Sequence, residues 1–191
     1  IYPVPVRCVV IPRWRYGYWV HKSHAFFIYR VYSVGDLGVS IKYRIKMINL
    51  QKGQRIEISL SKLGVGLGWD PNVGNGSDFD LDASAFMLGS NKKLPMDEFL
   101  VFYNNQLSPD GAVESSGDDT SGGNSDGGDD ETLIIDLTKV DSSIQEIIFT
   151  VTIHEAEVRK QNFGQVHNSY IRIYNMITNE EDDTYIESEK I

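Results

Sequence analysis

Three aspartates at alternate positions of one apolar run constrain the fold of this chain more than any other feature. The run is Asp78-Phe79-Asp80-Leu81-Asp82-Ala83-Ser84-Ala85-Phe86. In an extended strand, successive side chains point to opposite faces, so the aspartates and Ser84 share one face and the residues between them share the other. We therefore expect a strand whose apolar face packs into a core and whose other face carries carboxylates about 7 Å apart.

The rest of the chain has the same β character. Alternating or β-branched runs predict strands at 56–60, 64–69, 100–103, 132–137, 147–153 and 170–174, with turn-rich loops between them. Residues 139–146 predict one short helix, with Asp141 or Ser142 as its N-cap. This pattern favours an all-β fold, an antiparallel β-sandwich with long acidic loops and at most a short helix.

Glycines alternate with apolar residues in the strand predicted at 64–69. Gly64, Gly66 and Gly68 leave one face of that strand nearly bare, which lets another backbone approach closely. A nucleotide-binding interpretation of this run is weak, because no helix follows to offer its N-terminus to a phosphate.

A second acidic cluster, at 117–131, has six acidic residues among 15, with glycines that suit a wrapping loop. Such a segment alone is typical of a flexible, solvated loop. Beside the row of aspartates it becomes a source of further ligands. Close carboxylates repel one another unless a cation lies among them, and calcium takes six to eight oxygen ligands. We therefore expect Ca²⁺ to bind between the row and the loop.

Other chemistries fit the acidic residues less well. An EF-hand that starts at Asp78 requires glycine and glutamate where Ala83 and Gly89 stand. Zinc is disfavoured, because Cys and His residues are not grouped at ligand spacing. Acid–base catalysis requires two carboxyls in different environments within a cleft, and a row of equivalent exposed aspartates does not suggest one. His154 and His167 are interpreted as structural residues.

Several segments together resemble the TerD family of tellurium-resistance proteins. The segments 65–70 (Val-Gly-Leu-Gly-Trp-Asp) and 78–86 look like the family's defining motif. The acidic loop at 117–131 is similar to the family's acidic loop, with extra residues in its middle. The segments 149–156 and 161–168 match two further parts of the family, in the same order.

This resemblance implies a calcium-binding β-sandwich linked to resistance to tellurium oxyanions and to other stresses, with no established enzymatic activity. It implies no catalytic residue and no organic cofactor, and it suggests protein partners within a stress-response complex. The aspartates that match the family, among which the sequence does not separate direct ligands from neighbours, are Asp70, Asp78, Asp80, Asp82, Asp118, Asp119, Asp129 and Asp130.

The charge of the chain changes sign near Met47. Residues 1–46 carry eight Lys or Arg and one acid, whereas residues 47–191 carry ten and 26. We expect residues 1–46 to be an extension outside the domain and 47–191 to be the TerD-like domain. The competing view is that the extension adds a strand to the sandwich. Because the family continues beyond the equivalent of Asn179, we also expect the sandwich to be incomplete at its C-terminal end.

Composition limits the partners and the compartment. A formal net charge of -9 argues against nucleic acid as the main partner. The most apolar stretch, 25–41, is too short and too interrupted for a membrane span, and a single cysteine suits the cytoplasm.

Two alternatives to a calcium module remain open, a small-molecule or cyclic-nucleotide-binding module and a carboxylate-based hydrolase.

Overall fold

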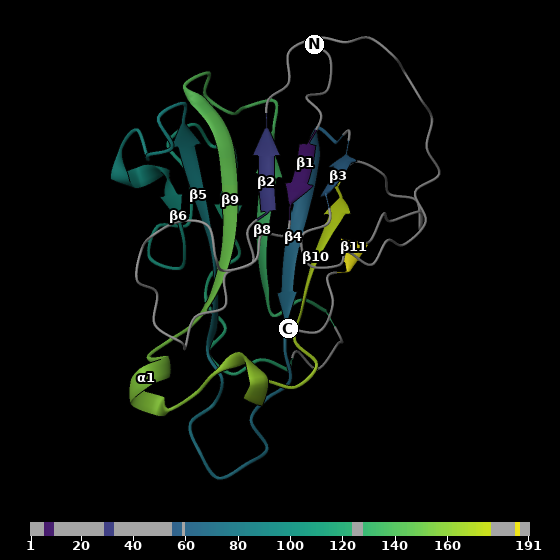
Figure 1. The fold of residues 1–191 in the computed structure, drawn as a ribbon, viewed down its shortest axis with the longest axis vertical. Helices are drawn as coiled ribbons and strands as arrows, with labels where there is room; N and C mark the ends of the chain where they lie inside the picture. Colours follow the sequence, from purple (N-terminus) through teal and green to yellow (C-terminus); the bar gives the residue numbers. More distant parts are fainter. Residues whose placement is uncertain are drawn as a thin grey trace.

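The protein is described by a computed structural model over residues 60–123 and 128–176, together with the backbone of four short strands at 6–9, 29–32, 55–58 and 186–187. Its two larger antiparallel sheets lie face to face, which confirms the predicted all-β sandwich (Figure 1). The elements, in chain order, are β1 (Val6–Val9), β2 (Tyr29–Tyr32), β3 (Arg55–Ile58), β4 (Lys62–Gly68), β5 (Leu81–Gly89), η1 (Asp97–Phe99), β6 (Leu100–Val101), β7 (Val113–Ser115), β8 (Glu131–Asp136), β9 (Ile144–Ile153), α1 (Ala156–Arg159), η2 (Phe163–Gln165), β10 (Tyr170–Asn175) and β11 (Ile186–Glu187).

Strand β4 lies at the centre of the five-stranded sheet, whose order is β11-β10-β4-β8-β7. It pairs with β10 along one edge and with β8 along the other. Leu67, near the end of β4, pairs with Glu131, the first residue of β8. This register brings the end of the acidic loop next to the end of β4.

The four-stranded sheet has the order β2-β9-β5-β6. The β-branched run at 147–153 forms a strand, as predicted, and it is an inner strand because β9 lies between β2 and β5. Strand β5 begins opposite the end of β9, where Leu81 pairs with Ile153 and Asp82 pairs with Thr152. The aspartates of the row therefore lie at the same end of the sandwich as the segment that follows β9.

Inward-facing side chains of both sheets form one hydrophobic core. The apolar members of the aspartate run, Phe79, Leu81, Ala83 and Ala85, are buried in this core, as predicted. The partners of these side chains from the other strands include Leu63, Val65, Leu67, Leu133, Ile135, Ile147, Phe149, Val151, Ile171 and Ile173.

The alternate glycines of β4 leave room for side chains, and the expectation of a closely approaching backbone is wrong here. A Cβ atom at Gly64 would meet the ring of Tyr174, and one at Gly68 would meet the ring of Tyr170. At Gly66 it would meet the carboxylate of Asp129. Residues of β10 and of the acidic loop therefore cover this face of the strand.

Two short strands come from residues 1–46. Strand β1 pairs with β3 in a separate two-stranded sheet. Strand β2 pairs with β9 from Tyr29 opposite Phe149 to Tyr32 opposite Glu146. Strand β2 thus adds one strand to the four-stranded sheet, which is the arrangement that competes with a domain boundary at residue 47. The boundary itself stays a prediction.

The short helix predicted at 139–146 does not form. Turns occupy this region, and β9 already begins at Ile144. The Asp141 carboxylate accepts a hydrogen bond from the Ser143 N–H at 2.8 Å, so it caps a turn. In the described part of the chain α1, with four residues, is the one α-helix. No helix in that part is long and apolar enough to cross a membrane.

Candidate metal centre

Three connecting segments meet at one end of the sandwich, the lower end in Figure 1. They join β4 to β5 (69–80), β7 to β8 (116–130) and β9 to β10 (154–169). Backbone hydrogen bonds tie them together: Gly123 N–H donates to the Trp69 carbonyl at 2.9 Å, and His154 N–H donates to the Asp80 carbonyl at 2.8 Å. This end of the molecule therefore gathers both acidic clusters of the sequence.

Three of the predicted aspartates converge here. One carboxylate oxygen each of Asp80, Asp82 and Asp118 lies within 4.8 Å of the other two. Asp82 stands at the second position of β5, Asp80 lies just before that strand, and Asp118 comes from the acidic loop. The expected pairing of row and loop is thus present for these three residues.

The two row aspartates are buried, contrary to the expectation of an exposed row. Asp80 is 6% exposed and Asp82 is 7% exposed, whereas Asp118 is exposed to solvent. Burial, together with the neighbouring charges of Asp80 and Asp118, raises the pKa of Asp82 to about 6. Burial also raises the pKa of Asp80, although His154 and Arg159 oppose that effect.

Glu131 is a fourth acidic group near the site, and the sequence analysis did not include it among the candidate ligands. Its carboxylate links the two sheets, because Oε2 accepts a hydrogen bond at 2.8 Å from the N–H of Ala83 in β5. Burial, with the charges of Asp82 and Asp118, raises its pKa to about 8. A signal existed in the sequence: Glu131 shares the core face of its strand with Leu133 and Ile135, and an acid on such a face is rare.

Three other predicted aspartates hold protein groups instead of facing the cluster. Oδ1 of Asp119 accepts hydrogen bonds from the N–H groups of Ser121 and Gly122, both at 2.9 Å, which lowers its pKa although burial opposes the effect. Oδ2 of Asp130 accepts the Trp69 N–H at 2.7 Å. Asp129 accepts hydrogen bonds from Arg172 and from the Tyr170 hydroxyl.

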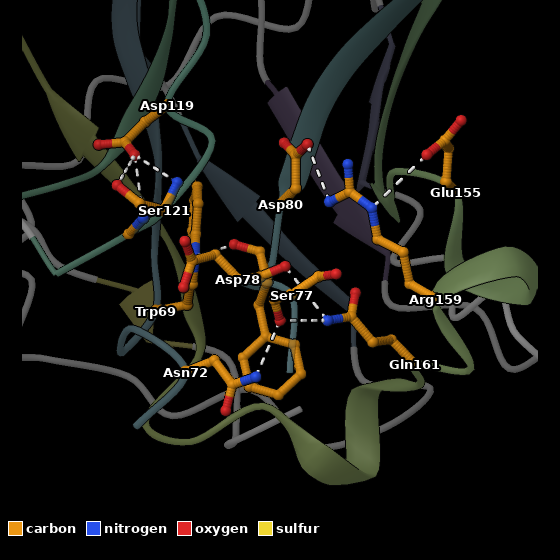
Figure 2. A network of polar contacts seen from close by, with 12 residues as sticks. Trp69, Asn72, Ser77, Asp78, Asp80, Asp119, Ser121, Glu155, Arg159 and Gln161 are labelled. Atoms are coloured by element: carbon orange, nitrogen blue, oxygen red, sulfur yellow. Dashed lines mark hydrogen bonds and ion pairs between the residues drawn. The ribbon is translucent and has the colours of Figure 1, made fainter. Parts of the chain in front are cut away.

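The remaining two lie in the segment between β4 and β5. Oδ2 of Asp70 accepts a hydrogen bond at 2.6 Å from the Asn168 side chain. Asp78 is exposed, and its carbonyl accepts a hydrogen bond from the side chain of Gln161. Figure 2 shows Asp78 between Trp69 and Ser77. The row of three thus contributes two members, Asp80 and Asp82, to the cluster.

Cationic groups approach the cluster from the segment that follows β9. Nη1 of Arg159 lies 3.3 Å from Oδ2 of Asp80, and Nε of the same residue lies 3.6 Å from Oε2 of Glu155 (Figure 2). His154 also acts electrostatically on Asp80. Even with these groups nearby, the carboxylates of Asp80, Asp82 and Asp118 lie close together, and two of the three residues are buried.

The donor set fits a hard divalent cation. All the converging groups are carboxylate oxygens, the ligand type that calcium and magnesium prefer. Burying such groups together is unfavourable without a counterion, and burial and the charges of Asp80 and Asp118 raise the pKa of Asp82 for this reason. A cation among Asp80, Asp82 and Asp118 would remove that cost.

Comparison with known proteins places the chain in a family. The family model described as "TerD domain" matches residues 47–190. The chain is 47% identical over 133 residues to the tellurium resistance protein TerD of Serratia marcescens, which covers 67% of this chain and 68% of that protein. It is 45% identical over 140 residues to general stress protein 16U of Bacillus subtilis, which covers 70% and 72%. The chain belongs to the TerD domain family.

Solved structures agree on the fold. The crystal structure of a homologue of telluride resistance protein (TerD) from Streptomyces coelicolor A3(2) superposes with a TM-score of 0.53 at 23% identity, over 62% of this chain and 68% of that one. The family therefore gives this chain its fold and its general type, that of the tellurium-resistance and stress-response proteins.

Proposed function

We propose that this protein is a calcium-binding, non-enzymatic module of the tellurium-resistance and general stress-response type. The observation that carries the proposal is the convergence of Asp80, Asp82 and Asp118, whose oxygens lie within 4.8 Å of one another although two of the three residues are buried. The names of the relatives support the stress-response part, and the oxygen-only donor set supports the calcium part.

Calcium suits this cluster better than magnesium. Magnesium requires near-ideal octahedral geometry and gives up its water reluctantly, whereas calcium accepts irregular sets of six to eight oxygens. Asp80 and Asp82 are held by a strand and its start, while Asp118 comes from a loop on the opposite side. Such a set adapts to a larger ion, and water molecules at exposed Asp118 would complete the coordination.

The hydrogen bonds of the buried acid Glu131 support a non-enzymatic role. Glu131 has the raised pKa that a general acid needs, but both of its oxygens accept backbone N–H groups, from Ala83 at 2.8 Å and from Asp119 at 3.4 Å. A buried carboxyl group that links the two sheets in this way stabilises the fold. This argument favours the module over the carboxylate-based hydrolase.

The test is a calorimetric titration of the full chain, freed of metal by a chelator, with calcium and separately with magnesium. We expect calcium to bind more tightly than magnesium and to raise the melting temperature. Asp82→Asn should weaken calcium binding at least about tenfold, because it removes a charged ligand. The matched control is Asp97→Asn, at an exposed aspartate of η1, which should leave the affinity unchanged. An identical melting curve with and without excess calcium would refute the proposal.

A further inference from the structure

Two arginine–aspartate pairs lie near the acidic loop, and their geometry differs. Arg172 binds Asp129 through two hydrogen bonds, Nε to Oδ1 at 2.7 Å and Nη2 to Oδ2 at 2.9 Å. Arg159 reaches Asp80 through one contact of 3.3 Å between Nη1 and Oδ2. Two-point arginine–carboxylate pairs are strong and geometrically fixed, whereas a single long contact is weak. The Arg159–Asp80 pair is therefore the one that a competing cation can displace.

The two pairs also differ in what the aspartate does. Asp129 packs over Gly66 of β4 and anchors the end of the acidic loop. Asp80 belongs to the group of three carboxylates that forms the candidate metal centre. The side chain of Arg159 is 23% exposed, whereas the side chain of Asp80, which its guanidinium contacts, is 8% exposed. A positive charge in that position neutralises Asp80 and repels any cation that approaches it.

We propose that Arg159 is the resident counterion of the metal centre, which competes with calcium for Asp80 and so sets the calcium affinity of the protein. This inference rests on the proposed calcium function. In the metal-free protein the guanidinium offsets part of the repulsion among the buried carboxylates. When calcium binds, the ion takes over that role, and the contact between Arg159 and Asp80 is weakened or lost.

The backbone around Arg159 connects the candidate metal centre to an exposed turn of the chain. Helix α1 has four residues and stands between Glu155, with φ of 49°, and Lys160, with φ of 54°. Non-glycine residues seldom adopt this left-handed conformation. The helix presents Val158, which is 78% exposed. The contact between Arg159 and Asp80 connects this exposed turn to the start of β5, so its loss should loosen α1.

The first measurement is calcium affinity by calorimetry at low ionic strength, in the wild-type chain and in three variants. Repulsion between a guanidinium and a divalent ion a few ångströms apart weakens binding by about tenfold even at the dielectric constant of water. Arg159→Gln should therefore tighten calcium binding about tenfold, and Arg159→Lys, which keeps the charge, should stay close to the wild type. The control Lys160→Gln removes the adjacent exposed charge and should change the affinity less than about twofold.

The second measurement is hydrogen exchange of the Arg159 and Lys160 amides, which donate to the carbonyls of Glu155 and Glu157. Saturating calcium should speed their exchange in the wild type and change it little in Arg159→Gln, where the contact is already absent. Unchanged or weaker calcium binding in Arg159→Gln, with Arg159→Lys also unchanged, would overturn the competition while leaving the calcium function intact. Exchange that calcium does not alter in the wild type would overturn the coupling to α1. A wild-type chain that binds no calcium would overturn both the inference and the function on which it rests.

Discussion

Replacing Asp82 by asparagine should stabilise the metal-free protein although it damages the metal centre. The pKa of Asp82 is raised from 3.8 to about 6 by burial and by its acidic neighbours. At pH 8 the group is ionised in both the folded and the unfolded state, so the folded state bears the full cost of that shift. At about 1.4 kcal/mol per pKa unit, the cost is about 3 kcal/mol.

Asparagine has nearly the same shape without the charge, although its buried amide still requires hydrogen-bond partners. We therefore expect a net gain of about 2 kcal/mol in the free energy of unfolding, or a rise in melting temperature of about 4 to 8 °C at this chain length. The assay is thermal unfolding at pH 8 in the presence of a chelator, followed by the same measurement in excess calcium. Calcium should then stabilise the variant much less than the wild type.

The control is an aspartate that holds the loop instead of facing the cluster. Asp119 accepts backbone hydrogen bonds from Ser121 and Gly122, and its pKa is lowered. Asp119→Ala should therefore reduce the stability of the metal-free protein by about 1 kcal/mol. If Asp82→Asn lowers the metal-free melting temperature as Asp119→Ala does, Asp82 is a structural group, and the reasoning about a destabilised binding site is wrong.

Three further predictions follow from the same region. In the metal-free protein, burial raises the pKa of Glu131 from 4.5 to about 8 and that of Asp82 from 3.8 to about 6. Between these values the folded state holds protons that the unfolded state has lost, so the urea midpoint of unfolding should fall as pH rises from about 5 to 8. A urea midpoint that does not change with pH would contradict the raised pKa values. Asp129→Ala should destabilise the protein by about 3 kcal/mol in thermal unfolding, because it leaves a partly buried Arg172 without this carboxylate; a change below about 0.5 kcal/mol would show that the pair anchors nothing. Gly66→Ala should reduce the thermal stability more than Gly128→Ala, since a Cβ at Gly66 would collide with Asp129 while one at Gly128 meets no atom within 4 Å; equal effects would contradict the packing described for β4.

Local pattern was sufficient to predict most of the sheet structure. The alternation around Asp80 and the β-branched run before His154 each predicted a strand, and the structure pairs these two strands as β5 and β9. The prediction of a helix at 139–146 was wrong. The local propensity of this segment is overridden by sheet pairing, since Ile144 and Glu146 enter β9 opposite Gly89 and Leu88.

The candidate site was predictable in part. The row identified Asp80 and Asp82 by their spacing, but residues of the acidic loop have the same composition whether they face a metal or hold the protein together. What separates them is tertiary. Asp130 binds a backbone group 61 positions away and Asp129 binds an arginine 43 positions away, and neither distance can be obtained from local pattern.

The two ends of the acidic loop therefore have different roles. At its C-terminal end three consecutive acids are each attached to a different strand: Asp129 to β10, Asp130 to the end of β4 and Glu131 to β5. At its N-terminal end Asp118 is exposed and faces the buried pair from the opposite side. A cation held by Asp80, Asp82 and Asp118 would therefore join the start of β5 to the N-terminal end of the loop, as the hydrogen bond from Ala83 to Glu131 joins β5 to its C-terminal end.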